Sequence, residues 1–321
     1  MVEPSARAGC ATLVSVIVLT FNRRDEVLRT LGMLAALPEQ PPIVVVDNAS
    51  TDGSAEAIVE RFPQVTLVRL STNVGAAGRN YGVAAVQTPY VAFCDDDTWW
   101  SPGSIARAVE ILERHRTVAL VCARILIGEA ERVDPVSICM AHSPLPAEGL
   151  PGQTIIGFMA GASVIRVAAF RQVGGYCPRL FLGCEEELMA LDLARCGWHM
   201  LYCDELIVHH FPSRSRHPPA RSALAARNAV WIACLRLRWR EVVRRLAAIM
   251  ALRGVRLRTL WQTMLGLPWA LSERTVIPSA IEQMRARVAA QDHPTPLRSA
   301  GTPIVMALIQ RIREILHADS P

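Results

Sequence analysis

The stretch LVSVIVLTF, residues 13–21, is apolar or β-branched along almost its whole length. A run of this kind is typical of a parallel strand that is covered on both faces. Strands that alternate with helices indicate βαβ units, so the sequence predicts an α/β fold with a Rossmann-like, mostly parallel central sheet flanked by helices. Three further apolar runs, with helical segments between them, support this prediction: PPIVVVD (41–47), VTLVRL (65–70) and YVAFC (90–94).

Polar side chains stand where these strands end, and the glycine-rich segment NVGAAGRNYG (73–82) follows the third strand. In open parallel sheets, ligands bind beyond the carboxyl ends of the strands, which predicts a nucleotide-binding crevice at this edge. The glycines let the backbone approach a ligand, and Arg79 could meet a base or a phosphate. Turn chemistry and close helix packing are the structural alternatives for these motifs. The polar residues of the predicted crevice are Thr20, Asn22, Asp47, Asn48, Asn73, Asp95, Asp96 and Asp97.

Asp95, Asp96 and Asp97 are consecutive and directly follow the fourth apolar run. Three adjacent carboxylates repel one another unless a cation neutralises them. Hard oxygen ligands such as Asp95 and Asp97 suit Mg²⁺ or Mn²⁺ that also binds a diphosphate. His209 and His210 end a later strand, where one of them could complete the metal shell through a neutral ring nitrogen. A solvated acidic loop and a structural histidine pair are the alternatives.

Glu185, Glu186 and Glu187 begin another predicted helix. The helix dipole favours carboxylates in a first turn, so these glutamates could serve only to stabilise the helix terminus. The functional alternative is a general base, in which one carboxylate near the metal site removes the proton from an acceptor hydroxyl.

The composition narrows the class of protein. The chain has 321 residues, 51% hydrophobic and 20% charged, so it can bury a core and is not intrinsically disordered. All 34 basic residues are arginine, and the lack of lysine excludes Schiff-base chemistry and a P-loop lysine. Nine cysteines without a CxxC pair predict free thiols in a reducing compartment. Without a signal-peptide pattern or a long apolar run, we expect a cytoplasmic protein with no membrane span.

The charge is unevenly distributed along the chain. Residues 1–210 hold 16 arginines and 23 acids, whereas residues 211–321 hold 18 arginines and 6 acids. The two parts therefore have different roles. Few aromatic residues and the absence of a reading motif argue against nucleic acid as the partner of the basic part.

The basic part contains an apolar pattern at helical spacing. Arg236, Arg240 and Arg244 lie along another face of the same segment, which predicts one amphipathic basic helix. This helix either docks its apolar face on the rest of the protein or rests peripherally on an anionic membrane surface. The segment IVMALIQRIREIL (304–316) poses the same choice, with self-association added. The apolar residues of the predicted helix are Trp231, Leu235, Trp239, Val242, Leu246 and Ile249.

Taken together, the ordered motifs of residues 13–211 resemble family 2 glycosyltransferases of the GT-A fold. The resemblance implies a loose N-terminus (1–12), a GT-A catalytic domain (13–211) and a helical Arg-rich C-terminal region (212–321). Within the catalytic domain, residues 13–100 resemble the nucleotide-sugar half and residues 101–211 the acceptor half. The motifs are VSVIVLTFNR, VVVDNASTDGS, NVGAAGRNYG and FCDDDTWWSPG in the first half, and GASVIRVAAFRQVGGY and EEEL followed by ARCGW in the second.

The resemblance implies an inverting transferase that uses a nucleotide diphosphate sugar and a divalent metal, Mn²⁺ or Mg²⁺. Its acceptor would be a glycan or a lipid-linked saccharide, as in cell envelope polysaccharide biosynthesis. Asp97 would be the principal metal ligand, Asp95 would lie near the ribose and the metal, and Asp96 would belong to the nucleotide-sugar site. His210 matches the metal-facing histidine, with His209 one residue away. The remaining nucleotide-site residues would be Thr20, Asn22, Asp47, Asn73 and Arg79.

Two departures from the family pattern bear on the reaction. The family usually has Glu-Asp-x-Asp-Leu at the acceptor helix, whereas this chain has Cys-Glu-Glu-Glu-Leu. Alignment on Leu188 makes Glu185 the base, and alignment on the first glutamate makes Glu186 the base. The Gln-x-x-Arg-Trp motif of processive synthases is absent, which favours addition of a single sugar. The altered acceptor motif also leaves open an inactive nucleotide-binding relative that acts as an assembly partner.

Overall fold

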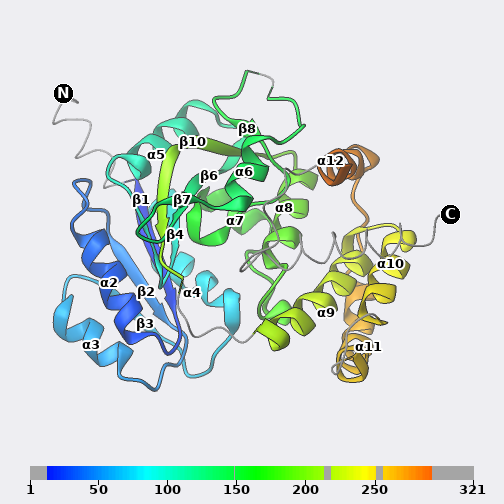
Figure 1. The fold of residues 1–321 in the computed structure, drawn as a ribbon, viewed down its shortest axis with the longest axis horizontal. Helices are drawn as coiled ribbons and strands as arrows, with labels where there is room; N and C mark the ends of the chain where they lie inside the picture. Colours follow the sequence, from blue (N-terminus) through cyan, green and yellow to red (C-terminus); the bar gives the residue numbers. More distant parts are fainter. Residues whose placement is uncertain (1–12, 148, 213–217, 251–255, 291–321) are drawn as a thin grey trace.

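The computed structural model describes residues 13–147, 149–212, 218–250 and 256–290. Within these ranges, one mixed sheet is flanked by helices on both faces, and a group of helices packs beside it (Figure 1). The strands are β1 (Val14–Thr20), β2 (Ile43–Asp47), β3 (Thr66–Arg69), β4 (Tyr90–Asp95), β5 (Thr98–Trp100), β6 (Val118–Ile127), β7 (Arg132–Val133), β8 (Gln153–Thr154), β9 (Ser163–Arg166) and β10 (His199–His210). The helices are α2 (Arg24–Ala35), α3 (Ser54–Arg61), α4 (Gly78–Ala85), α5 (Ser104–Arg114), α6 (Pro135–Ala141), α7 (Val167–Gln172), α8 (Glu185–Arg195), α9 (Pro218–Arg236), α10 (Trp239–Met250), α11 (Arg256–Ser272) and α12 (Ser279–Ala290).

The sheet has the order β3-β2-β1-β4-β9-β6-β10-β5, with β7 beside β6 and β8 beside β10. The first four strands are parallel, which confirms the prediction for the N-terminal half. Thr20 is in register with Asp47, and Leu19 is in register with Asp95. The polar residues that end these strands therefore meet at one edge of the sheet.

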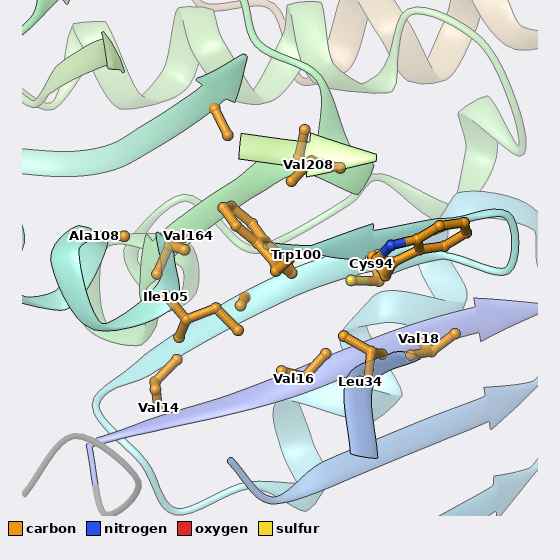
Figure 2. Packing of buried hydrophobic residues seen from close by; sticks show 14 of the residues in the cluster. Val14, Val16, Val18, Leu34, Cys94, Trp100, Ile105, Ala108, Val164 and Val208 are labelled. Atoms are coloured by element: carbon orange, nitrogen blue, oxygen red, sulfur yellow. The ribbon is translucent and has the colours of Figure 1, made fainter. Parts of the chain in front are cut away.

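Strand β1 is buried on both sides, as its apolar sequence predicts. Val14, Val16 and Val18 face a cluster that also contains residues of α2, α3 and α5 (Figure 2). Ile17 faces the opposite cluster, which includes residues of α4, α7 and α8. This alternation follows from the two-residue period of a strand, and it fixes which side of the sheet each helix covers.

Two segments in the middle of the chain fold differently from what their local sequence suggests. HMLYC (199–203) and ELIVHHF (205–211) each have the length of a short strand, whereas β10 is a single strand whose register with β6 shifts between Cys203 and Ile207. The shift lets the exposed pair Asp204 and Glu205 leave the ladder without ending the strand. Residues 128–157 are loop-like in sequence, because they are rich in proline and glycine. This segment contains α6, where the Asp134 carboxylate caps the helix by accepting a hydrogen bond from the Val136 N–H at 2.7 Å.

The continuous helix predicted across residues 231–249 is also wrong. Helix α9 ends at Arg236 and α10 begins at Trp239. The carbonyl oxygens of Leu235 and Arg236 accept hydrogen bonds from the N–H groups of Thr275 and Ile277, at 2.7 and 2.8 Å. These distant backbone donors take the place of the next helical turn, so the chain can change direction here.

The apolar face of this segment docks on the rest of the protein. The side chains of Trp231, Leu235, Val242 and Ile249 are buried in a third cluster. The same cluster contains Leu180, Cys184, Leu188 and Leu191 from the segment around α8. Leu246 is partly buried against the same cluster, whereas Trp239 is 57% exposed, so docking is confirmed for this face except at Trp239. The predicted loose N-terminus (1–12) and tail helix (304–316) lie outside the described residues. No described helix has the length and the apolar character needed to cross a membrane.

Candidate functional site

The first part of the site joins the loops that follow β1 and β2. Asn22 has a positive φ of 51° and accepts a hydrogen bond from the Thr51 N–H at 2.8 Å, so it ties the two loops together instead of capping α2. Asp47 is buried and accepts from the Ser50 N–H at 3.0 Å. The hydroxyl of Thr20 is buried with no hydrogen-bond partner among the described residues. A buried hydroxyl of this kind is available to a ligand.

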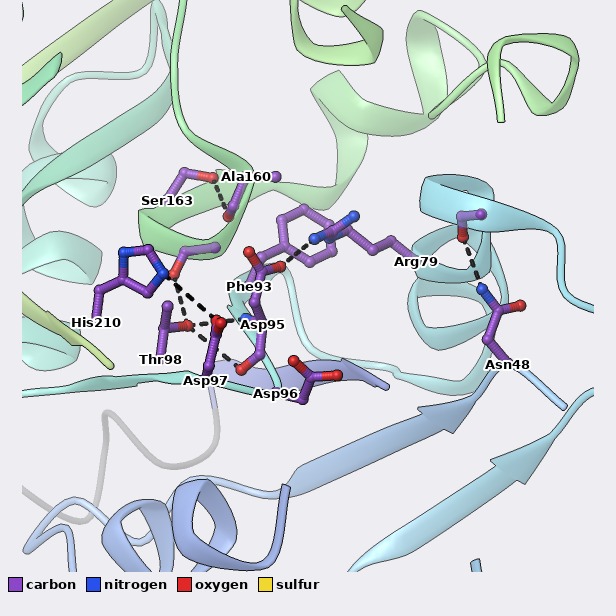
Figure 3. Close-up of polar contacts among 12 residues, drawn as sticks. Asn48, Arg79, Phe93, Asp95, Asp96, Asp97, Thr98, Ala160, Ser163 and His210 are labelled. Carbon is purple, nitrogen blue, oxygen red and sulfur yellow. Dashed lines mark hydrogen bonds and ion pairs between the residues drawn. The ribbon is translucent and has the colours of Figure 1, made fainter. Parts of the chain in front are cut away.

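The glycine-rich loop lies against these strand ends. The side-chain amide of Asn48 holds the loop through two hydrogen bonds. Its Nδ2 donates to the Gly75 carbonyl at 3.0 Å (Figure 3), and its Oδ1 accepts from the Val74 N–H at 2.9 Å. Asn73 accepts from the Gly75 N–H at 2.9 Å. Gly75 has a φ of 64°, and a Cβ there would lie 2.0 Å from the Phe181 carbonyl oxygen. Only glycine fits, because the loop before α8 packs directly on this backbone.

Arg79 lies within the protein and pairs with Asp95. Its side chain is 7% exposed, forms an ion pair with Asp95 and lies over the Tyr176 ring at 5.5 Å. Burial alone would lower the pKa of Arg79, but the charge of Asp95, with Tyr176 and the α8 carboxylates, raises it above its ordinary value. Arg79 therefore orients Asp95, whose side chain is still 44% exposed and can reach a ligand. The structure places Arg79 beside this carboxylate, where we expected a contact with a base or phosphate.

The other two aspartates share a contact that the sequence analysis missed. Arg23 Nη1 lies 2.9 Å from Asp96 Oδ1 and 3.2 Å from Asp97 Oδ2. Burial raises the pKa of Asp96 to about 7, Arg23 opposes this shift, and the neighbouring aspartates reinforce it. The Asp96 side chain is therefore buried against Arg23, whereas the Asp95 side chain is 44% exposed. The sequence showed the arginine after β1, but the pattern did not indicate which acid it meets.

The two histidines at the end of β10 point to different surroundings. His210 Nε2 lies 3.6 Å from Asp97 Oδ1 (Figure 3). His209 Nε2 lies 2.7 Å from Ser101 Oγ, and its ring stacks on Trp99. Because successive strand residues face opposite sides, only one of the pair can meet the aspartates, and the structure brings His210 there. No group of three or more His, Cys, Asp or Glu side chains among the described residues is gathered closely enough to hold a metal alone.

Helix α8 presents its three glutamates in different directions. Glu185 is buried, Glu186 is half-buried, and both contribute to the electrostatic environment of Arg79. Glu187 instead lies 2.6 Å from Arg245 and 3.3 Å from Arg285, two arginines of the C-terminal helices. Glu187 therefore anchors those helices, while Glu185 and Glu186 remain on the side of the strand ends.

The loop before α8 is held by a residue that sequence analysis also missed. Asn228 of α9 is fully buried, and its Nδ2 donates to three carbonyl oxygens of this loop. Phe181 and Cys184 in the loop have positive φ values of 62° and 66°, which are unfavourable for residues with a Cβ. The sequence shows no sign of this role, because an asparagine within a helical pattern does not stand out. The role becomes visible only when α9 is seen packed on this loop. The carbonyls bonded by Asn228 belong to Leu180, Leu182 and Gly183.

Comparison with known proteins agrees with this geometry. Residues 15–174 match the family model described as glycosyl transferase family 2. The N-acetylglucosaminyl-diphospho-decaprenol L-rhamnosyltransferase of Mycobacterium tuberculosis is 25% identical over 261 residues, which cover 67% of this chain and 81% of that protein. The UDP-Glc:alpha-D-GlcNAc-diphosphoundecaprenol beta-1,3-glucosyltransferase WfaP of Escherichia coli is 27% identical over 108 residues, 32% of this chain and 43% of that protein.

The fold is also that of known glycosyltransferases. The mannosyltransferase PcManGT from Pyrobaculum calidifontis, solved in complex with GDP-Man and Mn²⁺, superposes with a TM-score of 0.53 at 20% sequence identity. The match covers 94% of this chain and 80% of that one. The sequence motifs, the strand-end site and these similarities lead to one conclusion: the chain belongs to glycosyl transferase family 2 and is a glycosyltransferase with the GT-A fold.

Proposed function

We propose that the protein transfers one sugar from a nucleotide diphosphate sugar to a hydroxyl of a saccharide carried on a polyprenyl diphosphate, with inversion. The observation that carries the proposal is the pair of Asp97 and His210 at the strand ends, with the exposed Asp95 two residues earlier in the chain and Glu185 and Glu186 at the start of α8. The names of the two relatives quoted above both specify a sugar linked through a diphosphate to a polyprenol, which supports this acceptor class. The acceptor class also supports a site of action at the cytoplasmic face of a membrane.

The donor would lie across the ends of β1, β2 and β4. Asp47 is buried there and can accept a hydrogen bond from a nucleobase imide, while the Thr20 hydroxyl offers a further contact. The loop at Gly75 lets the backbone approach the diphosphate closely. Asn22 and Asn73 act in this proposal by fixing the two loops that form the walls.

A divalent cation, Mn²⁺ or Mg²⁺, fits the donor set at this edge. Such ions take one or two protein carboxylates and complete their shell with substrate phosphates and water, and imidazole nitrogen suits Mn²⁺. Asp97 and His210 would hold the ion, and the exposed carboxylate of Asp95, two residues before Asp97, would be a further candidate ligand. When bound, the ion supplies positive charge for the departing diphosphate.

The chain's own carboxylates would handle the proton. Glu185 or Glu186 accepts the proton of the acceptor hydroxyl as its oxygen attacks the anomeric carbon, and the bond to the diphosphate breaks on the opposite face. Both glutamates lie on the side of Arg79 and Asp95, so the altered acceptor motif still offers a base. For this reason we do not favour an inactive assembly partner.

The two histidines and Asp97 test the proposal. We expect Asp97→Ala and His210→Ala to lower turnover by roughly 10²-fold or more with the fold intact, and His209→Ala, as the matched control, to stay near wild type. The measurement is sugar transfer to a polyprenyl-diphosphate saccharide, together with calorimetric titration of UDP, GDP and dTDP with and without Mn²⁺. Near-normal turnover of Asp97→Ala would refute the assignment of Asp97 as a metal ligand. Lack of any nucleotide binding with Mn²⁺ would overturn the transferase proposal itself.

A further inference from the structure

Helix α11 buries its small residues and exposes most of its large apolar residues, although Leu260, Leu267 and Trp269 are partly buried against the core. Toward α9 it buries Thr259, Thr263 and Ala270, and Gly266 packs so closely on the Trp231 ring that a Cβ would lie 2.3 Å from it. The opposite face is exposed and apolar. This is the reverse of an ordinary surface helix, which buries its large apolar side chains. The exposed residues and their exposed fractions are Leu257 76%, Trp261 67%, Met264 57%, Leu265 65% and Leu271 43%.

These side chains form a continuous stripe. Leu257, Trp261 and Leu265 are four residues apart, and Met264 lies three residues after Trp261 and seven before Leu271, so all five share one face along α11, about 25 Å at 1.5 Å per residue. No charged residue occurs between Thr259 and Ser272. A contiguous exposed apolar face of this kind marks an interaction surface.

The charge around the stripe indicates what covers it. Arg258 is exposed at the start of α11, Arg240 is exposed on the neighbouring α10, and the exposed Glu273 follows the end of α11. The whole segment 211–321 holds 18 arginines and 6 acids, so a second copy of the chain would bring like charge against like charge. Apolar and aromatic side chains bordered by arginines, on a helix of this length, suit the interface of an anionic lipid layer.

The stripe also lies on the acceptor side of the molecule. The Trp231 Nε1–H of α9 donates to the Thr263 carbonyl of α11 at 2.8 Å, which fixes α11 on α9. Asn228, one turn earlier on α9, holds the loop before Glu185 and Glu186. In Figure 1, α9 and α11 lie on the same side as α8 and away from α2 and α3.

We propose that the exposed face of α11 (Leu257, Trp261, Met264, Leu265 and Leu271) rests on an anionic membrane surface, with the helix axis parallel to it. The geometry thereby holds the acceptor side of the enzyme at the lipid layer, where a polyprenyl-linked saccharide is found. The orientation toward this acceptor rests on the proposed function, whereas lipid binding does not. The face differs from the one predicted from sequence, which apart from Trp239 is packed against the catalytic region.

The test is sedimentation of the full chain with phosphatidylcholine vesicles, with and without phosphatidylglycerol. We expect binding to the anionic vesicles that weakens with salt, and a loss of about tenfold or more for the double variant Trp261→Ser/Leu265→Ser. The matched control is Val59→Ser on α3, where the exposed fraction is 59%, and we expect it to bind like wild type. Thermal unfolding should be nearly unchanged in all variants, because the substituted side chains are exposed.

Three results would overturn the proposal: no binding to anionic vesicles, equal binding of the double variant and wild type, or a dimer of wild type that the double variant converts to a monomer. Turnover on an acceptor with a short, water-soluble lipid separates the two proposals. We expect the double variant to match wild type on this substrate. If wild type itself fails to transfer sugar but still binds vesicles through α11, the proposed function fails and the membrane surface stands.

Discussion

Replacement of Asn228 by alanine tests whether the C-terminal helices shape the catalytic site. The Asn228 Nδ2 lies 2.8 Å from the Leu180 oxygen, 3.1 Å from the Leu182 oxygen and 2.6 Å from the Gly183 oxygen, in a fully buried setting. The Leu180 oxygen also accepts from Arg227 Nη2 at 3.1 Å, so the substitution leaves two carbonyl oxygens, those of Leu182 and Gly183, without a donor from Asn228, and Arg227 loses its contacts with Asn228 Oδ1. At about 1–3 kcal/mol for each buried carbonyl left unsatisfied, Asn228→Ala should lower the free energy of unfolding by about 2–6 kcal/mol.

The same variant should reduce turnover. The loop released by the substitution leads directly into Glu185 and Glu186, so we expect kcat to fall at saturating donor while the affinity for nucleotide changes little. Urea unfolding measures the stability, and sugar transfer together with nucleotide titration separates kcat from binding. Arg236→Met is the matched control, because it breaks the ion pair of α9 with Asp192 on α8 without touching the loop.

The outcome that refutes this reasoning is specific. Stability of Asn228→Ala within about 0.5 kcal/mol of wild type would show that the three contacts contribute little. A loss of stability with wild-type kcat would show that the loop does not position the α8 glutamates. The control should lose stability and keep its kcat. If kcat of Arg236→Met also fell, the lower kcat of Asn228→Ala would be explained by general destabilisation of the protein.

Two further predictions concern the neighbourhood of Asp95 and the anchor at Glu187. Gly161→Ala would place a Cβ 2.7 Å from Asp95 Oδ2, so we expect this carboxylate to move and the Mn²⁺-dependent nucleotide affinity, measured by calorimetry, to fall about tenfold. Unchanged affinity would contradict a role for Asp95 at the donor. Burial alone would raise the pKa of Glu187, but Arg245 and Arg285 outweigh burial and hold it below its ordinary value of 4.5. The stability from this carboxylate is therefore complete above the ordinary pKa and lost as the pH falls through the lower, folded-state value, so Glu187→Gln should flatten the acid side of the stability profile in urea unfolding. An equally steep acid loss in the variant would place the titrating group elsewhere.

The parallel half of the fold could be predicted from sequence because its information is local. Each strand from Leu13 to Asp95 is a short apolar run that ends in a polar residue, and parallel strands bring such ends together. The family resemblance added the acceptor half. By contrast, the break between α9 and α10 depends on backbone donors at Thr275 and Ile277, some forty residues away in the chain. An amphipathic period alone cannot reveal such a partner.

The polar contacts of the site show the same limit. The sequence places His209 and His210 at a strand end, but choosing between them requires the register that sets His210 beside Asp97. Arg23 was visible in the motif, yet its contact with Asp96 and Asp97 depends on how the β1–α2 loop folds back over the end of β4. Tertiary packing decides which carboxylate an arginine contacts. The pattern of strands in the sequence cannot predict that contact.

The ion pairs between α8 and the C-terminal helices affect how this enzyme can be recombined with its relatives. Glu187 pairs with Arg245 and Arg285, and Asp192 pairs with Arg236, so one helix carries two charged anchors for the segment that follows. A chimera joined near residue 211 would separate both acids from these arginines. Asp192 would keep Arg195 of α8 at 3.5 Å, whereas the largely buried Glu187 would be left uncompensated, at about 3–5 kcal/mol. Grafts intended to exchange acceptor preference therefore need α8 and α9–α12 from the same parent.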